Sequence, residues 1–254
     1  MSADASRDEV AREIRRHDLL SIPVVDERNR LLGIVTVDDV LDAIVDAQTR
    51  RVQRYGGVEA LERSYLDTSF GTMIRKRAGW LSVLFLSEML TASAMQHFEG
   101  ELERAVMLTL FIPLIMSSGG NSGSQATSLI IRALALGQLR LRDWWRVALR
   151  ELPAGLTLGV ILGCVGVARI AIWQMLGFYD YGSHWMLIGL TVGLGLVGIV
   201  TFGSLAGSML PFALQRLNFD PASASAPFVA TLVDVTGLVI YFSIALVILL
   251  GTLL

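Results

Sequence analysis

Cysteine is almost absent from this chain, which has one such residue, Cys164, in a total of 254. One cysteine excludes a disulfide within a single chain, and it also excludes a cysteine-rich metal site. Histidine is scarce, and charged residues make up only 17% of the sequence. The formal net charge of −2 provides no basic excess, so we expect no nucleic-acid partner.

Two further signals are missing. The first residues, MSADASRDEVAREIRRHD, contain no apolar run, so we do not expect a secretory signal peptide there. The sequence also lacks a Walker motif, which argues against an ATP-driven pump. We therefore do not expect an enzyme.

Apolar residues are abundant and unevenly distributed. They make up 53% of the chain, and most of the charged residues precede residue 78. This pattern predicts a polytopic membrane protein that is all-α apart from a small α/β segment. We expect a partial cytoplasmic segment at 1–50, a helical connector at 51–77 and a five-helix membrane domain at 78–254.

The N-terminal segment is predicted to contain two short strands, Ser21–Val25 and Leu31–Thr36, joined by the turn sequence DERN. An amphipathic helix is predicted over Val37–Ala47. Short helical connectors are predicted at Val58–Leu66 and Thr68–Arg77, after a glycine pair. Elements of this size cannot bury a core alone, so we expect a partner or a missing half.

Acidic residues recur along one face of the predicted helix. Asp38, Asp42 and Asp46 are four residues apart, and Asp39 is adjacent. Like charges at this spacing destabilise a helix slightly, and a bound divalent cation would relieve the repulsion. A solvated acidic face explains the same pattern, and the residues alone favour that interpretation.

Five apolar segments are long enough to cross a bilayer, which requires about 20 residues. They are Ala78–Phe98, Ala105–Gly137, Glu151–Leu176, Trp185–Leu214 and Ala226–Leu254. The fourth carries Gly189/Gly193 and Gly203/Gly207 at GxxxG spacing, which predicts tight helix packing.

The fifth segment holds a single charged residue, Asp234. At helical spacing Asp234 shares a face with the small or polar residues Ala230, Thr231, Gly237 and Tyr241. A carboxylate at membrane depth is costly, and it usually faces a protein interior or a water-filled path. We expect Asp234 to line a cation path, and a neutral, hydrogen-bonded aspartate at a helix contact is the alternative.

Two other intramembrane features suggest a cation path. Glu88 lies midway along the first segment, where it either binds a cation or is protonated and hydrogen-bonded between helices. Ser117–Ser128 reads SSGGNSGSQATS, and its glycines are unfavourable in a regular helix. We expect irregular backbone lining a cavity there, with its carbonyls and the Asn121 side chain contacting a hydrated cation through water, and Gln125 also favours this functional interpretation. The alternative is close helix packing through small residues.

Basic residues predict the orientation in the membrane. Arg75–Arg77 and the arginines of Arg140–Arg150 fall on the same side after two crossings. The loop between the first two segments is acidic instead, with Glu99, Glu101 and Glu103 against Arg104. The positive-inside rule then places the N-terminus in the cytoplasm and the C-terminus outside, in a multi-pass protein of the cell (inner) membrane.

Longer motifs resemble known proteins. LLSIPVVDERNRLLGIVTVDDVLDAI resembles the closing half of a CBS module, a regulatory fold that usually works in pairs. GVEALERSYL, SSGGNSGSQATSLIIRALALG and SAPFVATLVDVTGLVIYF resemble the MgtE family of magnesium channels and transporters. The order of the two regions also fits that family.

The resemblance implies a homodimer whose pore lies at the subunit interface and is lined mainly by the second and fifth helices. Asp234 matches the family's pore aspartate, and Ala230 would contribute its backbone carbonyl. Gly120 and Asn121 match positions beside the ion path. Ala226 stands where relatives carry a polar asparagine, so a side-chain ligand is not expected there.

The resemblance also implies that Mg²⁺ is the transported ion and a regulatory ligand. In the family, the CBS domains and a connecting helix close the pore when cytosolic Mg²⁺ is plentiful. Asp38, Asp39, Asp42 and Asp46 match acidic positions of that sensor. Relatives carry further acids where this chain has Ala47–Arg51 (AQTRR), and half of the module is missing, so we expect a weakly gated or constitutively conducting pore.

The expected function is therefore the transport of hydrated Mg²⁺ through a dimer-interface channel, with membrane lipids and divalent cations as partners. A gradient-coupled secondary transporter for Mg²⁺, Mn²⁺ or Co²⁺ is the alternative, with Asp234 and Glu88 carrying protons or sodium. A membrane-anchored CBS module that senses a nucleotide is a third interpretation, against which the missing half module argues.

Overall fold

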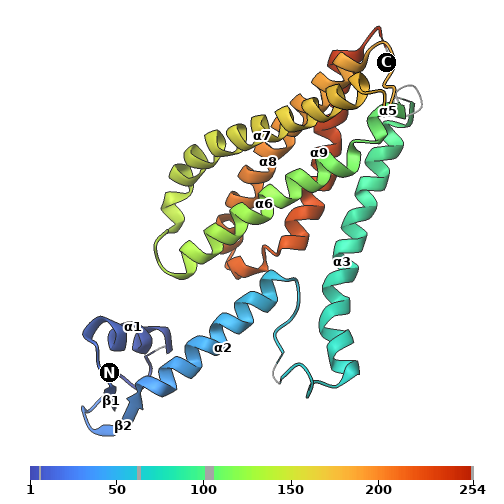
Figure 1. The fold of residues 1–254 in the computed structure, drawn as a ribbon. Helices are drawn as coiled ribbons and strands as arrows, with labels where there is room; N and C mark the ends of the chain where they lie inside the picture. The colour runs from blue at the N-terminus through green and yellow to red at the C-terminus, as the bar shows by residue number, and fades with distance from the viewer. Residues whose placement is uncertain (6, 62–63, 101–105, 253–254) are drawn as a thin grey trace.

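The computed structural model describes residues 1–5, 7–61, 64–100 and 106–252. Figure 1 shows a small N-terminal α/β unit joined through one long helix to a helical bundle. Within the described residues, five helices are long and apolar enough to span a membrane. The chain is therefore a multi-pass membrane protein in its architecture, as the apolar segments predict.

The N-terminal unit contains α1 (Arg7–His17), β1 (Ser21–Val25) and β2 (Leu31–Thr36). The two strands pair antiparallel, and their predicted bounds are confirmed. The sequence analysis did not predict α1, because the helix is polar and has few apolar positions. Its buried residues Val10 and Ile14 nevertheless pack against Ile22 of β1 and Val40 of the following helix, and these four residues form a small core.

The helix after β2, α2, runs over Val37–Tyr55 and is two turns longer than predicted. Its first turn is capped by the Asp39 carboxylate, which accepts hydrogen bonds from the backbone nitrogen of Thr36 (3.0 Å) and from its hydroxyl (2.5 Å). The last two turns were missed because QTRRVQRY lacks apolar periodicity, although its arginines and glutamines are good helix formers. The helix ends at Gly56, and Gly57 turns the chain with a φ of 75°.

The predicted helical connector at Val58–Leu66 is wrong for its described part, since residues 58–61 and 64–66 form no helix. Side chains of α2 and of the following helix form hydrogen bonds with the backbone of this segment instead. The backbone nitrogen of Leu61 donates to Oε1 of Gln53 (2.8 Å), and the Lys76 ammonium donates to the carbonyl of Ala60. The second predicted connector is continuous with the first span, because α3 covers Phe70–His97 after an N-cap at Ser69.

The remaining spans follow the predicted order with shifted ends. A short helix, α5 (Val106–Thr109), precedes α6 (Ile112–Ala135), and α7 (Trp144–Met175) begins two turns earlier than predicted. The bundle closes with α8 (Trp185–Arg216) and α9 (Ala226–Leu249). Two short 3-10 turns, η1 (Leu141–Asp143) and η2 (Pro221–Ser223), precede α7 and α9. The acidic loop residues Glu101 and Glu103, with Arg104, lie outside the described residues.

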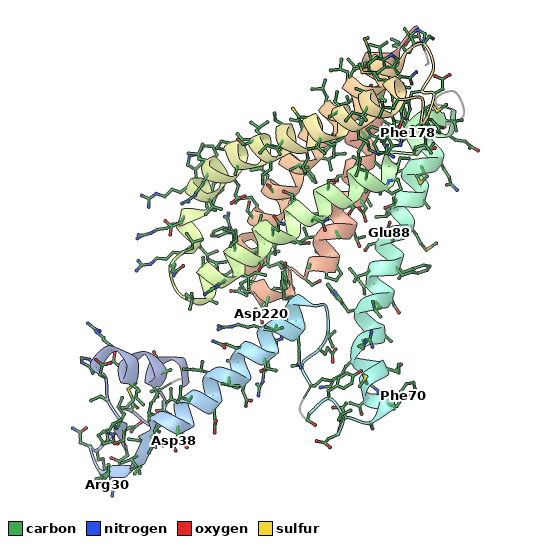
Figure 2. All side chains as sticks on the ribbon, in the orientation of Figure 1. Arg30, Asp38, Phe70, Glu88, Phe178 and Asp220 are labelled. Atoms are coloured by element: carbon green, nitrogen blue, oxygen red, sulfur yellow. The ribbon has the colours of Figure 1, made fainter. Side chains whose placement is uncertain are left out.

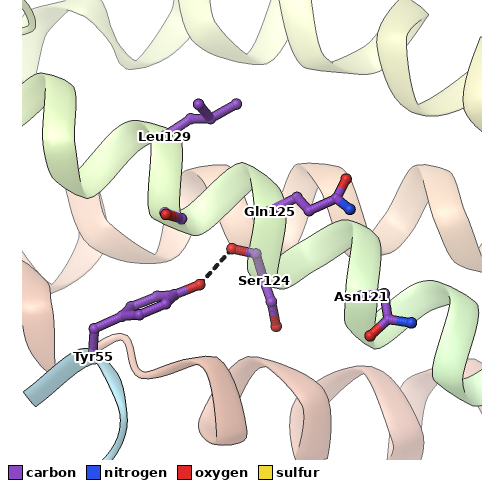
Figure 3. Close-up of a pocket in the computed structure, with 6 residues that line it drawn as sticks. Tyr55, Asn121, Ser124, Gln125 and Leu129 are labelled. Carbon is purple, nitrogen blue, oxygen red and sulfur yellow. Dashed lines mark hydrogen bonds between the residues drawn. The ribbon is translucent and has the colours of Figure 1, made fainter. Parts of the chain in front are cut away.

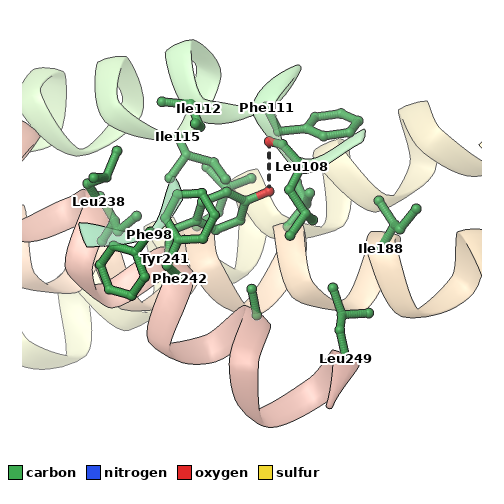
Figure 4. Packing of buried hydrophobic residues seen from close by; sticks show 14 of the residues in the cluster. Phe98, Leu108, Phe111, Ile112, Ile115, Ile188, Leu238, Tyr241, Phe242 and Leu249 are labelled. Atoms are coloured by element: carbon green, nitrogen blue, oxygen red, sulfur yellow. Dashed lines mark hydrogen bonds between the residues drawn. The ribbon is translucent and has the colours of Figure 1, made fainter. Parts of the chain in front are cut away.

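Helix α8 is the centre of the bundle and packs against α6, α7 and α9, whereas α3 lies at the side and packs against α9 (Figure 1). The main core joins the C-terminal end of α3 with α5, α6, α7, α8 and α9 (Figure 4). In that core the Tyr241 hydroxyl donates to the carbonyl of Leu108 (3.2 Å), and the rings of Phe98 and Phe242 stack at 5.0 Å. These contacts fix α9, the helix that carries Asp234, to the other helices.

The expected irregular backbone at Ser117–Ser128 is wrong, because α6 is a continuous helix through this stretch. Its glycines are used for close packing on α8, which was the alternative interpretation. A Cβ added at Gly203 would lie 2.4 Å from the carbonyl oxygen of Gly119, and one added at Gly207 would lie 2.1 Å from that of Gly123. The GxxxG prediction for Gly203/Gly207 is thus confirmed, and the backbone contact offsets the low helix propensity of glycine.

Candidate functional site

One face of α6 is polar and exposed. Ser117, Asn121 and Gln125 follow one another at four-residue spacing, and all three are exposed. The amide nitrogen of Asn121 donates to the Ser117 hydroxyl at 3.4 Å, a long hydrogen bond. Amide groups facing lipid would lack hydrogen-bond partners, at a cost of a few kcal/mol each, so this face suits water or another polypeptide.

The polar face borders a groove of about 620 Å³ (Figure 3). The groove is lined by Tyr55 from the end of α2 and by residues of α6, namely Asn121, Ser124, Gln125, Ser128 and Leu129. It therefore joins the helix that leaves the N-terminal unit to the polar face of a membrane helix.

Tyr55 lines this groove from the end of α2. Its hydroxyl donates a 2.6 Å hydrogen bond to the backbone carbonyl of Ser124. Burial raises the pKa of the Tyr55 phenol, so the hydroxyl keeps its proton and remains a donor at neutral pH. The neighbouring Arg54 forms an ion pair with Asp220, which lies beside the end of α2 (Figure 2). The end of α2 is thus attached both to α6 and to the turn before α9.

A second set of contacts leads from this attachment to the start of α9. The Trp80 indole nitrogen of α3 donates to the Ser225 hydroxyl at 3.1 Å, and that hydroxyl caps α9 by accepting from the backbone nitrogen of Phe228. Gly57 packs against Trp80, because a Cβ added at Gly57 would lie 2.7 Å from the indole ring. The first turn of α9 is therefore positioned by α3 and by the turn that ends α2.

Asp234 is half-buried, two turns into α9. The preceding residue, Val233, packs against Gly119. Gly120 packs against Ala230, because a Cβ added at Gly120 would lie 3.4 Å from the Cβ of Ala230. The structure thus brings Gly120 and Ala230 together, beside the turn of α9 that carries Asp234. Asn121 follows Gly120 on the exposed side of α6.

Glu88, about two thirds of the way along α3 (Figure 2), is half-buried as well, and it lies within electrostatic range of Asp234 on the neighbouring helix α9. Within the part of the chain that the structure describes, neither carboxylate has a hydrogen-bond or ion-pair partner. Two unpaired acids at membrane depth are costly, and a nearby cation or water would offset that cost.

The face predicted around Asp234 is divided in the structure. Ala230 and Thr231 are partly exposed like Asp234, whereas Gly237 and Tyr241 are buried within the subunit. Gly237 packs on Ile199 of α8. The part of this face nearer η2, which holds Ala230, Thr231 and Asp234, is thus accessible to a cation path. The part that holds Gly237 and Tyr241 belongs to the core of the subunit.

The acidic residues of α2 have different environments. Asp38, Asp42 and Asp46 are exposed. Asp39 caps the helix, and its hydrogen bonds from the hydroxyl and then the backbone of Thr36 lower the pKa of its carboxyl. Across the described ranges, no group of three or more histidine, cysteine or acidic side chains is placed to hold a metal ion.

Sequence reasoning missed Tyr55, Ser124 and Ser128. Tyr55 gave no signal because its role depends on α2 extending past Ala47 and on a partner carbonyl in a distant helix. Ser124 and Ser128 did give one, since they are four residues apart and border the exposed face that Asn121 and Gln125 define.

Comparison with known proteins agrees with this architecture. The family model described as divalent cation transporter, MgtE, matches residues 112–244, and the CBS domain model matches residues 1–46. The magnesium transporter MgtE of Thermus thermophilus is 44% identical over 242 residues, which is 95% of this chain and 52% of that protein.

The magnesium transporters MgtE of Enterococcus faecalis and Bacillus subtilis are 35% and 33% identical over 94% and 96% of the chain. The chain spans about half the length of these curated relatives. The first family model covers α6 to α9, the helices that carry the polar face and Asp234. The chain belongs to the MgtE family of divalent cation transporters.

Proposed function

We propose that this chain conducts Mg²⁺ across the cell membrane along a path bordered by α6 and α9. One observation carries the proposal: an unpaired, half-buried Asp234 at membrane depth lies on α9, beside the helix whose exposed face presents Ser117, Asn121 and Gln125. The relatives' name, magnesium transporter, supports the choice of ion.

The donor set suits a hydrated ion better than a bare one. Mg²⁺ loses water reluctantly and binds through one or two carboxylates while keeping several waters. Asp234 supplies a carboxylate, Asn121 an amide and Ala230 a backbone carbonyl, all of which accept hydrogen bonds from metal-bound water. Oxygen donors of this kind discriminate weakly against Mn²⁺, so selectivity depends on the size of the path.

A homodimer is part of the proposal. The exposed amides of α6 do not suit lipid, and a second copy of the chain would cover them while leaving a water-filled path between the subunits. Two copies would bring two Asp234 carboxylates and two Glu88 carboxylates to the path. Glu88 would then increase the local attraction for a divalent cation without contacting it directly.

The orientation and the domain boundaries complete the proposal. A cytoplasmic N-terminus and an outside C-terminus, in the inner membrane, are supported by the arginine-rich turn between α6 and α7, which lies at the end of the bundle nearer α2 (Figure 1). The parts are a partial CBS segment at 1–50, a connector at 51–77 and the membrane domain at 78–254.

Regulation by Mg²⁺ is proposed to be weak. Asp38, Asp42 and Asp46 are available to a cation on α2, but Asp39 already serves the helix cap. The attachment of α2 through Tyr55 would let changes in the N-terminal unit reach the groove.

A gradient-coupled transporter is the second candidate, favoured by the unpaired Glu88 close to Asp234. Purified chain in liposomes separates the two. Mg²⁺ uptake driven by membrane potential alone, and unchanged by a pH or sodium gradient, supports a channel. Uptake that requires either gradient contradicts the channel and supports coupled transport.

A further inference from the structure

The turn between α6 and α7 carries a group of arginines that the proposed ion path does not use. We call it the arginine cluster, and it consists of Arg140, Arg142, Arg146 and Arg150. All four are exposed, and the side chain of Arg146 is 86% exposed. The group extends from the N-cap of η1 through the first two turns of α7, where a membrane-spanning helix begins.

Nearby acids neutralise only part of this charge. Asp143 approaches Arg146 at 3.6 Å, but its other oxygen accepts a 2.9 Å hydrogen bond from the backbone nitrogen of Arg140. Glu151 is half-buried and interacts electrostatically with Arg150. Four arginines thus face two acids in this part of the described chain, so a net positive charge remains.

The rest of this surface is apolar and aromatic. Trp144 and Trp145 are 48% and 57% exposed, with their rings edge to face at 5.5 Å, and Leu149 is exposed beside them. The exposure does not come from a loosely held helix. Val147, in the same turns of α7, is buried in a cluster with Ile130 of α6 and Phe212 of α8.

We propose that the arginine cluster, with Trp144 and Trp145, binds the phosphate groups of anionic phospholipids in the leaflet on the side of the N-terminal unit. Guanidinium groups pair with phosphate through two parallel hydrogen bonds, and exposed indoles favour the boundary between headgroups and acyl chains. Arg146 and Arg150 are one turn apart, about 6 Å along the helix, which matches the depth of a headgroup layer.

A lipid fits this surface better than an acidic protein segment. Cation and indole alternate along the end of a membrane-spanning helix, so a ligand must satisfy a charged and an apolar contact together. A phospholipid carries both, with its phosphate beside the arginines and the indoles, and its acyl chain extending past Leu149 along α7. A polybasic surface of this kind attracts anionic lipid more strongly than zwitterionic lipid.

The test measures which lipid surrounds the tryptophans. The full chain is reconstituted in phosphatidylcholine vesicles containing the same fraction of either brominated phosphatidylglycerol or brominated phosphatidylcholine, and tryptophan fluorescence is recorded. The fluorescence of Trp144 and Trp145 is obtained by subtracting that of a Trp144→Phe/Trp145→Phe variant. We expect brominated phosphatidylglycerol to quench them more strongly, at an effective local concentration several-fold higher, and we expect salt to reduce the difference.

Three triple variants complete the experiment. Arg142→Gln/Arg146→Gln/Arg150→Gln should remove the preference, whereas the same positions changed to lysine should keep part of it. The matched control, Arg28→Gln/Arg50→Gln/Arg51→Gln, removes equal charge from the β1–β2 turn and from α2, and it should keep all of the preference. Equal quenching by the two brominated lipids in the parent chain overturns the proposal. An undiminished preference for phosphatidylglycerol in Arg142→Gln/Arg146→Gln/Arg150→Gln also overturns it. The readout needs no ion transport, so it stands apart from the test of the proposed function.

Discussion

The hydroxyl of Tyr55, at the end of α2, donates a 2.6 Å hydrogen bond to the backbone carbonyl of Ser124 in the middle of α6. This bond joins the helix that leaves the N-terminal unit to the membrane helix that carries the polar face. Because the acceptor is a backbone atom, the contact depends on Tyr55 and on the position of the two helices. The groove beside it is therefore the place where movement of α2 would reach the proposed ion path.

Removing this hydroxyl should loosen the end of α2. In Tyr55→Phe the loss of one hydrogen bond is expected to cost about 1 kcal/mol, or roughly fivefold in local opening. Hydrogen exchange of residues 52–57 in the purified full chain checks this. Tyr65→Phe is the control, because Tyr65 is exposed on the connector, and equal exchange in both variants would show that the Tyr55 bond does not hold α2.

The ion pair of Arg54 with Asp220 should contribute less, because both side chains are partly exposed. Arg54→Gln and Asp220→Asn are each expected to cost below about 1 kcal/mol, measured as thermal stability in detergent. Asp220→Asn keeps the side-chain oxygen that accepts from the backbone nitrogen of Ala222, so the variant isolates the charge. The double variant should cost no more than either single change, and fully additive losses would contradict the pairing.

The contact between α6 and α8 predicts a large effect of one methyl group. In Gly207→Ala the new Cβ would lie 2.1 Å from the carbonyl oxygen of Gly123, so the helices must separate. We expect a loss of about 3 kcal/mol or more and a much lower melting temperature in detergent. Gly79→Ala on α3 meets nothing within 4 Å and should be neutral or slightly stabilising. Similar melting temperatures for the two variants would show that α6 and α8 do not pack closely at Gly207.

The cap of α2 predicts a dependence on pH. The hydrogen bonds from Thr36 hold the pKa of the Asp39 carboxyl below its ordinary value of 3.8, so the stabilisation is present above that pH and is lost as the pH falls below it. Hydrogen exchange in the first turn of α2, corrected for intrinsic rates, should be faster in Asp39→Asn than in the parent at pH 7. The difference should vanish at acidic pH. Asp38→Asn, at an exposed position, should match the parent throughout.

The sequence predicted local features well and non-local ones poorly. The strands Ser21–Val25 and Leu31–Thr36 were predicted correctly because alternating apolar residues flank a turn sequence, and both signals are local. The five spans were predicted because apolar length is itself the signal. The end of α2 was missed, since its last two turns carry no apolar period.

The stretch SSGGNSGSQATS shows why the candidate site was only partly predictable. Its composition correctly indicated a special segment, but local glycine propensity indicated irregular backbone, whereas the structure has a continuous helix. The deciding contacts are with Gly203 and Gly207, far away in the sequence. Likewise, the proximity of Glu88 to Asp234 depends on how α3 packs against α9, which no local pattern specifies.

Because Glu88 lies within electrostatic range of Asp234, its charge should affect the apparent affinity for Mg²⁺ but not the maximal rate of uptake. In Glu88→Gln the loss of one nearby negative charge should raise the half-saturating Mg²⁺ concentration roughly fivefold, about 1 kcal/mol of electrostatic attraction, with little change in maximal uptake. Uptake into liposomes over a range of Mg²⁺ concentrations checks this. Glu59→Gln, at an exposed position on the connector, is the control. An unchanged half-saturating concentration in Glu88→Gln would show that this carboxylate does not act on the ion.

The proposed path of the ion runs past Asp234, and potential-driven Mg²⁺ uptake by Asp234→Ala is the sharpest check of that placement. The variant is compared in liposomes with the parent and with Asp220→Asn, after equal reconstitution has been verified. We predict that uptake through Asp234→Ala falls at least about tenfold, since the loss of the carboxylate removes more than about 1.4 kcal/mol of attraction for a divalent cation. Uptake equal to that of the parent would show that the ion does not pass Asp234.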